Sequence, residues 1–473
     1  MNYRSIGEEC GVFGIFSKNY VNTSKLVYYA LYALQHRGQE SCGIAISDRE
    51  LKKVTCYKDT GLVSEVFTMP VLSELVGNMA IGHARYDSMG RNTRENAQPL
   101  TIKYVKGTLS IALNGTISNT AEIRRELERH GAIFQSTNDT EVIAYLLAKE
   151  RLASASIEEA VSKIVPQLMG SYSMLVMSPQ KLIAVRDPYG IRPFCMGRRG
   201  DDIVFASESC AIDAIGATVV RDVRPGEIII AREDGIVSRT EHCTKNSALC
   251  IFEHIYFARP DSVIDGQSVY EARLEAGRIL ARVSPVEADI VIGTPDSGLP
   301  AAIGYAEESG IPYREGLLKN RYIGRTFIQP EQSMREESVS IKLNVLASNI
   351  KGKRIVLVDD SIVRGTTVRQ LVEMLKSAGA KEIHMRISSP EFLWPCYFGT
   401  DIPDREQLAC VNNTVDELCE KIGADSLAFL PLEKVHEIAK DSNLKFCDGC
   451  FSKNYPFEVP EKPSKIAFEI ISD

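Results

Sequence analysis

The first half of the chain alternates short apolar runs with polar, glycine-rich turns. Residues 11–16, 43–47 and 173–177 are apolar runs of strand length. Between them, residues 118–130 and 139–151 follow the spacing of helices with one polar face. This mixture, which continues to residue 238, predicts an α/β or α+β domain.

The second half follows a different rhythm, in which a strand, a polar loop and a helix repeat. Residues 288–293 form an apolar run, and a short loop separates it from a helical pattern at 299–309. The unit recurs as an apolar run at 354–358 followed by a loop and a helix, and a third run occupies 381–387. Such repetition predicts a parallel sheet whose sites lie at the carboxyl ends of its strands.

The composition fits a globular protein and argues against several classes. The 473 residues are 44% hydrophobic and 25% charged, which is enough for two or three domains with cores of their own. A net charge of -7, without any run of Lys or Arg, argues against a nucleic-acid partner. No apolar run reaches the roughly 18 residues that span a bilayer, and residues 1–9 lack the apolar core of a secretory signal. We therefore expect no membrane partner and a cytoplasmic location.

An acidic loop follows the apolar run at 354–358. Two carboxylates come where a buried strand ends, and a glycine and two hydroxyls come where a helix begins. Backbone N–H groups at a helix N-terminus bind phosphate, and carboxylates suit ribose hydroxyls or Mg²⁺. A solvated turn with a capping threonine is the alternative. The loop residues of interest are Asp359, Asp360, Ser361, Arg364, Gly365, Thr366 and Thr367.

This loop resembles the signature with which type I phosphoribosyltransferases bind phosphoribosyl pyrophosphate (PRPP). Residues 295–298, which include Asp296 and Ser297, resemble the pyrophosphate-side loop of that family. Residues 319–327 resemble its mobile loop. The resemblance implies a second domain of the type I phosphoribosyltransferase fold.

Transfer from PRPP makes demands that these residues can meet. Pyrophosphate leaves C1 of the ribose through a cation-like transition state, so the enzyme must neutralise the leaving anion. The resemblance implies Mg²⁺ at Ser297, Asp359 and Asp360. Arg325 and Lys342 are candidate cations, although Lys342 fits an ordinary surface lysine equally well.

Cys10 stands at the start of the first apolar run. If the first nine residues are removed, Cys10 becomes N-terminal, and its own α-amine, with a pKa of about 8, can activate the thiol. This arrangement is compatible with an N-terminal nucleophile. An inert buried thiol is the alternative.

Five segments resemble, in order, the motifs of N-terminal nucleophile glutamine amidotransferases. They occupy residues 10–14, 34–40, 82–86, 114–115 and 138–141. The resemblance implies that the first domain is an αββα sandwich of the N-terminal nucleophile (Ntn) hydrolase type.

The same resemblance implies a role for each charged or polar residue of these motifs. Arg85 would bind the α-carboxylate of glutamine and Asp139 its α-ammonium group, as a zwitterionic substrate requires. Asn114 and the backbone N–H of Gly115 would form the oxyanion hole for attack by Cys10. Each has a plainer alternative, since Asn-Gly is a common turn and Arg85 could form a surface ion pair.

Two positions depart from the usual motifs. Asp87 and Ser88 stand where Ser-Thr is usual, and Leu113 stands where a histidine normally precedes Asn-Gly. Ser88 keeps a hydroxyl group, so we expect glutamine binding to survive, while Asp87 adds a negative charge.

Twelve cysteines in a chain of this length are too dilute for a disulfide scaffold. Cys447 and Cys450 have the CxxC spacing that can bind one metal centre. With Cys250 and Cys396 they resemble the [4Fe-4S] ligands of one branch of the amidophosphoribosyltransferase family, in which a short propeptide also precedes the catalytic cysteine. A structural zinc site, or cysteines without any ligand, are the alternatives. A cluster here is expected to be structural or oxygen-sensing.

The resemblance to the amidophosphoribosyltransferases of de novo purine synthesis covers residues 10–456. It implies hydrolysis of glutamine and transfer of the ammonia to C1 of PRPP, giving 5-phosphoribosylamine, glutamate and pyrophosphate. It further implies a homotetramer that purine nucleotides (AMP, GMP and ADP) inhibit. The expected parts are a propeptide at 1–9, a glutaminase domain at 10–240, a phosphoribosyltransferase domain with the cluster ligands at 241–458, and a tail at 459–473.

Two rival functions follow from the same motifs. An amidotransferase with a different acceptor would have no need of the loop at 359–367. A PRPP-sensing regulator without turnover is the rival from another class, and the intact set of motifs around Cys10 argues against it.

Overall fold

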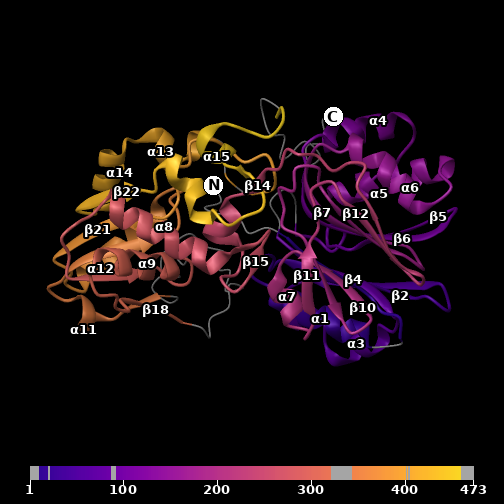
Figure 1. The fold of residues 1–473 in the computed structure, drawn as a ribbon, viewed down its shortest axis with the longest axis horizontal. Helices are drawn as coiled ribbons and strands as arrows, with labels where there is room; N and C mark the ends of the chain where they lie inside the picture. Colours follow the sequence, from indigo (N-terminus) through magenta and orange to yellow (C-terminus); the bar gives the residue numbers. More distant parts are fainter. Residues whose placement is uncertain are drawn as a thin grey trace.

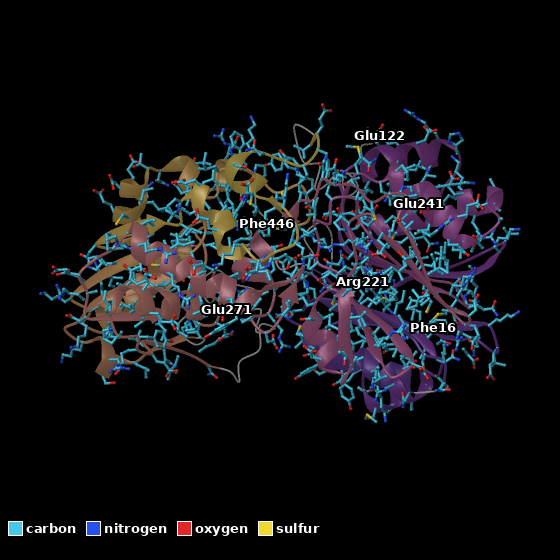
Figure 2. The ribbon with its side chains drawn as sticks, viewed as in Figure 1. Phe16, Glu122, Arg221, Glu241, Glu271 and Phe446 are labelled. Atoms are coloured by element: carbon cyan, nitrogen blue, oxygen red, sulfur yellow. The ribbon has the colours of Figure 1, made fainter. Side chains whose placement is uncertain are left out.

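The computed structural model shows two lobes, which follow one another along the chain (Figure 1). The first half of the sequence, from indigo to magenta, forms one lobe, and the orange and yellow second half forms the other. Side chains fill both lobes, with Phe16 in the first and Phe446 in the second (Figure 2). The structure describes residues 10–19, 22–86, 92–320, 343–400, 402 and 405–459.

The first lobe contains two antiparallel sheets. One has seven strands in the order β11 (Thr218–Asp222), β9 (Cys195–Arg199), β10 (Asp202–Ala206), β1 (Gly11–Phe16), β4 (Met79–Arg85), β2 (Ser41–Asp48) and β3 (Lys53–Thr60). The other has six strands in the order β13 (Gly235–Arg239), β12 (Ile228–Arg232), β8 (Leu182–Arg186), β7 (Gly170–Met177), β6 (Gly107–Ile117) and β5 (Leu100–Tyr104).

Helices cover the outer face of each sheet. The helices beside the seven-stranded sheet are α1 (Thr23–Ala33), α2 (Val63–Val66), α3 (Met69–Glu74) and α7 (Ser209–Asp213). Those beside the six-stranded sheet are α4 (Thr120–Arg129), α5 (Asp139–Ala153) and α6 (Ile157–Ile164). The layers are therefore helix, sheet, sheet and helix, which confirms the predicted αββα sandwich.

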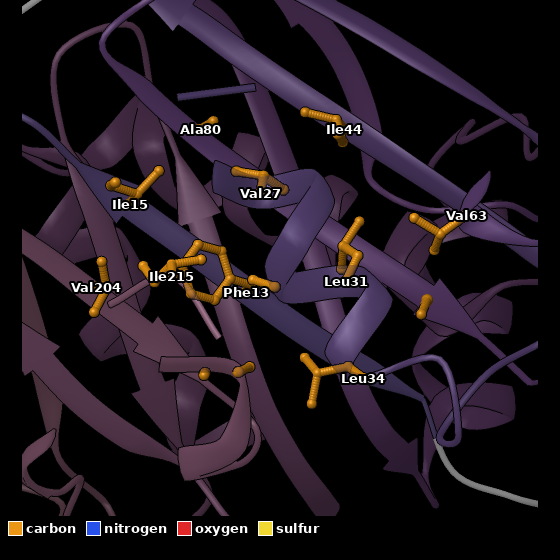
Figure 3. Packing of buried hydrophobic residues seen from close by; sticks show 14 of the residues in the cluster. Phe13, Ile15, Val27, Leu31, Leu34, Ile44, Val63, Ala80, Val204 and Ile215 are labelled. Atoms are coloured by element: carbon orange, nitrogen blue, oxygen red, sulfur yellow. The ribbon is translucent and has the colours of Figure 1, made fainter. Parts of the chain in front are cut away.

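The central strand β1 is buried along its whole length, as its continuous apolar run predicts. On one face, Phe13 packs in the same cluster as Val27 and Leu31 of α1 (Figure 3). On the other face, Val12 and Phe16 belong to the cluster between the two sheets. Each of these side chains contributes roughly 2 kcal/mol by leaving water. The first strand is thereby held between two layers, and the residue that precedes it is fixed in position.

The second lobe is built on a parallel sheet with the order β17 (Ile290–Gly293), β20 (Arg354–Asp359), β21 (Glu382–Ile387) and β22 (Ser426–Phe429). Two apolar clusters cover its faces. The principal helices are α8 (Val269–Val283), α9 (Leu299–Ser309), α12 (Thr366–Ser377) and α14 (Val415–Ile422). The predicted parallel sheet is confirmed.

Buried contacts join the two lobes. Arg186 of β8 donates hydrogen bonds of 3.0 and 2.7 Å to the carboxylate of Asp265. The hydroxyl of Ser171 donates to the carbonyl of Phe398 at 2.6 Å. Breaking a buried ion pair leaves a charge without compensation, so such contacts fix one arrangement of the lobes. Within the described ranges, no helix is long and apolar enough to cross a bilayer.

Candidate active sites and cysteine group

Cys10 lies directly before β1, at the amino end of the central strand of the seven-stranded sheet. Gly11 pairs with Ala84 of β4, so the same register places Cys10 beside Arg85. The Cys10 thiol contacts the carbonyl of Tyr86 at 3.6 Å. The structure therefore brings the predicted nucleophile and the predicted carboxylate-binding arginine together from segments 75 positions apart in sequence.

Asn114 reaches the same place from the facing sheet. Its side-chain amide meets the hydroxyl of Ser207 at 3.1 Å, and that hydroxyl also accepts from the N–H of Val12 at 2.9 Å. Within the described residues, Oδ1 of Asn114 has no hydrogen-bond partner. Nδ2 of Asn114 carries two hydrogens and donates one of them to Ser207, which leaves the other for an oxyanion.

Gly115 has a conformation that only glycine adopts without strain. Its φ is +131°, and a Cβ atom there would lie 2.0 Å from the carbonyl oxygen of Ser171. The glycine of the Asn-Gly pair is therefore required by close packing between β6 and β7 as well as by its backbone angle.

Asp139 begins α5 and lies within electrostatic reach of Arg85. The N–H of Ile117 donates to its carboxylate at 2.9 Å. Burial raises the pKa of Asp139 to about 6, although the hydrogen bonds from Ile117 and Thr120 and the charge of Arg85 act in the opposite direction. A cation opposite Cys10 and an anion within electrostatic reach of that cation match the two charges of a free amino acid.

Leu113, which stands where a histidine is usual, lies in the apolar core of the first lobe. The Leu113 side chain is buried in the apolar cluster that β6 shares with α5, while its carbonyl accepts a hydrogen bond from His83 at 2.9 Å. Asn114 points the other way because successive side chains alternate across a strand. Asp87 and Ser88 lie outside the described residues.

The second lobe has a pocket of about 250 Å³ at the carboxyl ends of β17 and β20. β17 and β20 run in parallel register, with Gly293 opposite Val358, so the loops after them meet. Gly365, with a φ of +79°, precedes α12 and turns the first N–H groups of that helix toward the pocket. The lining includes Tyr256, Ser297, Asp359, Asp360, Ser361, Arg364, Gly365, Thr366 and Thr367.

Two adjacent carboxylates dominate the charge of this pocket. Asp360 accepts a hydrogen bond from the hydroxyl of Ser297 at 2.5 Å, and its own N–H donates to Asp359 at 2.9 Å. Burial, and then the charge of Asp360, raise the pKa of Asp359 well above its usual value. The donor set of two buried carboxylates and a hydroxyl fits a hard divalent cation, which would offset the repulsion.

The remaining predicted PRPP residues lie on neighbouring segments. Asp296 forms an ion pair with Lys319, the last residue of β18 (Leu317–Lys319). β18 pairs with β19 (Leu343–Val345). The two predicted cations, Arg325 and Lys342, lie outside the described residues.

The four predicted cluster cysteines gather in the second lobe, where it meets the first. Cys250 of β14 (Leu249–Cys250) lies opposite Cys447 of β23 (Phe446–Cys447) in a parallel pair. The sulfur of Cys396 accepts from the N–H of Phe398 at 3.4 Å. Burial, and then the charges of Cys396, Cys250 and Cys447, raise the pKa of Cys450. No three His, Cys, Asp or Glu side chains in the described ranges are arranged to hold a single metal ion.

Sequence patterns did not predict two supports of the glutamine site. Arg37 lies in the motif at 34–40 and donates through Nε to the carbonyl of Cys10 at 3.1 Å. Gln98 accepts from the N–H of Leu113 at 2.8 Å and donates to Asn138, the N-cap of α5, at 3.4 Å. Gln98 thereby joins the strand of the oxyanion hole to the helix of Asp139. It lies in a polar turn without periodicity, so no local signal marks it.

Comparison with known proteins identifies the family. A model described as a glutamine amidotransferase domain matches residues 83–214, and one described as a phosphoribosyl transferase domain matches residues 272–388. The amidophosphoribosyltransferase of Archaeoglobus fulgidus is 49% identical over 453 residues, which cover 95% of this chain and 98% of that relative. The chain belongs to the amidophosphoribosyltransferase family. The Bacillus subtilis member is 45% identical over 461 residues, which cover 96% of each chain.

Solved structures of the family agree with the fold. The structure described as the allosteric regulatory enzyme of purine biosynthesis is similar to this chain with a TM-score of 0.90 at 44% identity. The match covers 96% of this chain and 97% of that structure's chain. The glutamine PRPP amidotransferase of B. subtilis, solved with ADP and GMP, has a TM-score of 0.88 at 44% identity and covers 96% of this chain and 99% of its own. The predicted family and the predicted succession of two folds are confirmed.

Proposed function

We propose that the first lobe hydrolyses glutamine at Cys10 and that the second lobe places the released ammonia on C1 of PRPP. The protein is an amidophosphoribosyltransferase, a transferase at the committed step of purine biosynthesis. The observation that supports the assignment of residues is the position of Arg85, which lies opposite Cys10 in the sheet register and within electrostatic reach of Asp139. Their opposite charges match the α-carboxylate and α-ammonium group of glutamine.

In the glutaminase site, the Cys10 sulfur attacks the side-chain amide carbon of the bound glutamine. The oxyanion that forms lies against Nδ2 of Asn114 and the N–H of Gly115. Collapse expels ammonia and leaves a thioester, and water then releases glutamate and the free thiol. Removal of residues 1–9, which lie outside the described ranges, makes the α-amine of Cys10 the base that takes the thiol proton.

In the phosphoribosyltransferase site, the loop from Asp359 to Thr367 holds the ribose and its phosphate. The N-terminus of α12 lines the pocket together with Ser361, Thr366 and Thr367, and these groups suit a phosphate. Asp296 and Ser297 approach from the neighbouring loop, where pyrophosphate would leave. Mg²⁺ bound by Asp359, Asp360 and Ser297 would neutralise charge on the leaving pyrophosphate. Arg325 and Lys342 are proposed to add positive charge.

We also propose that Cys250, Cys396, Cys447 and Cys450 hold a [4Fe-4S] cluster. Burial raises the pKa of Cys250, Cys447 and Cys450, so a bound metal would be needed to hold these three as thiolates. A zinc ion requires all its ligands around one point, whereas each cysteine of a cluster binds a different iron and the four can stand farther apart. The parallel pairing of Cys250 with Cys447 and the charges of Cys396, Cys250 and Cys447 on Cys450 support a shared site for the four cysteines. The expected role of the cluster is structural, because no step above transfers an electron.

The regulatory properties of the family belong to the same proposal. The B. subtilis relative was solved with ADP and GMP, which supports inhibition of this enzyme by purine nucleotides such as AMP, GMP and ADP. A homotetrameric assembly and a cytoplasmic location are proposed as well, and the domain limits at residues 9, 240 and 458 stay predictions.

The proposed function is tested by the intact mass and N-terminal sequence of anaerobically purified protein, together with glutamate release in the presence and absence of PRPP. An N-terminus at Cys10 and PRPP-stimulated glutamate release are expected. An uncut chain that binds PRPP without releasing glutamate would contradict the proposal and favour the PRPP-sensing regulator.

The cluster is tested by iron and sulfide analysis of the same preparation, with about four of each expected per chain. Cys450→Ser should lower the iron content and the visible absorbance, whereas Cys419→Ser, which changes a cysteine on α14, should leave both unchanged. One zinc and no iron per chain would instead establish the zinc alternative.

A further inference from the structure

Arg37 connects the catalytic cysteine to the second lobe. Besides its bond from Nε to the Cys10 carbonyl, it donates to the two carboxylate oxygens of Glu253 at 2.9 and 2.8 Å. It also donates to Glu208 at 2.6 Å. We call the contact between Arg37 and Glu253 the Arg37–Glu253 bridge. It is a route of side-chain contacts from the Cys10 backbone into the second half of the chain.

The bridge is rigid because its charges are buried. The side chains of Arg37, Glu208 and Glu253 are fully removed from water. Burial by itself would lower the pKa of Arg37, but the charges of Glu253 and Glu208 outweigh it and raise the pKa. Arg37 is therefore always charged, and a two-pronged contact of this kind fixes both distance and orientation.

Glu253 begins a π-helix, η2 (Glu253–Phe257), whose other end lies in the PRPP pocket. Tyr256 of this helix lines the pocket beside the acidic loop. Asp359 and Asp360 line the same pocket, so Tyr256 shares its surroundings with both carboxylates. Short π-helices are rare, and many occur at functional sites.

Arg273 of α8 holds the residues of η2 together through hydrogen bonds to their backbone carbonyls. It donates to the carbonyls of His254, Tyr256 and Ala258 at 3.0, 2.8 and 2.7 Å. These carbonyls lie within and just after η2, where a helix otherwise has unpaired acceptors. A shift of Tyr256 therefore moves the whole helix, Glu253 included.

We infer that the Arg37–Glu253 bridge couples the two active sites, so that PRPP in the second lobe sets the position of Cys10 in the first. This inference rests on the proposed function and adds the residues that carry the signal. Ligand at Asp359 and Asp360 changes the surroundings of Tyr256, η2 transmits the change to Glu253, and Arg37 passes it to the Cys10 carbonyl. Arg37 and Glu253 are positioning residues, because neither touches a reacting atom.

Another pair provides a matched control for the substitution. Arg186 and Asp265 also form a buried, two-pronged ion pair between the lobes, but Asp265 lies outside η2 and neither residue bonds to Cys10. Asp265→Asn removes the same charge as Glu253→Gln and suits the left-handed backbone at this position, where φ is 46°. It separates coupling from the stability of the lobe contact.

The experiment compares wild type, Glu253→Gln and Asp265→Asn in the full-length chain. Glutamate release is measured with and without PRPP, and PRPP amination is measured with ammonium salt in place of glutamine. For Glu253→Gln we expect the PRPP stimulation of glutamate release to fall by about tenfold, while ammonia-dependent amination stays within about twofold of wild type. Asp265→Asn should keep the wild-type stimulation.

Each other outcome overturns the inference. Full stimulation in Glu253→Gln would show that the signal does not use the bridge. Equal loss in both variants, or loss of ammonia-dependent amination in Glu253→Gln, would show general damage to the contact between the lobes. A wild type without any PRPP stimulation would refute the proposed function itself, and the coupling with it.

Discussion

The two active sites are built in opposite ways. In the second lobe, one continuous loop from Asp359 to Thr367 supplies most of the pocket. In the first lobe, the site is assembled from the start of β1, the end of β4, the middle of β6 and the start of α5. A parallel sheet presents whole loops at one edge, whereas a sandwich of antiparallel sheets brings together single residues from distant strands.

Because of this difference, the two sites are sensitive to different kinds of substitution. The loop site depends on local backbone geometry, such as the positive φ of Gly365. The scattered site depends on registers and on supporting side chains such as Gln98 and Arg37, far from one another in sequence. Substitutions should therefore separate the two half-reactions in one lobe and abolish both in the other.

The largest expected effect comes from Cys10→Ala. Without the nucleophile, glutamine-dependent formation of phosphoribosylamine should fall by at least about a thousandfold. Ammonia-dependent formation should stay within about twofold, because the second lobe is intact. A coupled assay with either nitrogen source measures both. Retained glutamine-dependent activity would mean that another residue is the nucleophile.

Asp360→Asn should have the next largest effect. It should lower the glutamine-dependent and the ammonia-dependent activity together. We expect about a hundredfold loss with glutamine and with ammonia alike, because the charge that holds Mg²⁺ beside PRPP is halved. Asp425→Asn is a suitable control, since Asp425 accepts from the N–H of Ile383 at the amino end of the same sheet. A loss confined to glutamine would argue against the assigned pocket.

Glutamine binding should weaken in acid. The pKa of Asp139 is raised from 3.8 to about 6, so its carboxylate gains a proton as the pH falls through that value and loses its attraction for the α-ammonium group. Calorimetry with the Cys10→Ala variant should show the Kd for glutamine rising by about tenfold per pH unit below about pH 6. The non-reacting variant removes the titration of the nucleophile from the measurement. A Kd that is constant between pH 5 and 7 would contradict the assignment of Asp139.

The smallest expected effect is that of Gln98→Leu, which tests the scattered supports. It leaves the N–H of Leu113 buried without an acceptor, at a cost of about 1–3 kcal/mol in unfolding free energy. Glutaminase activity should fall with it, while ammonia-dependent amination should not. Denaturant unfolding measures the stability, and the exposed Gln167→Leu should change it by less than about 0.5 kcal/mol. Wild-type glutaminase activity in Gln98→Leu would show that Gln98 does not position the site.

Periodicity predicted the longer elements well and the short ones poorly. The helix expected at 299–309 is α9, and the one expected at 139–151 is α5, which continues to Ala153. β22 was not predicted because its four residues are too few to show alternation. η2 was missed because five residues cannot show a helical repeat, and its structure depends on the carbonyl contacts of Arg273.

The sequence by itself determined which chemical groups each segment carries, because a strand end, a glycine or a carboxylate can be identified from the local sequence alone. It marked Cys10, the acidic loop and the CxxC pair. Only the tertiary structure decided which segments meet. Sheet register places Cys10 beside Arg85, and the packing of the two sheets brings Asn114 to Ser207, which is bonded to β1. The Arg37–Glu253 bridge joins residues 216 positions apart, and such a contact is fixed by the burial of both lobes against each other, which no local pattern records.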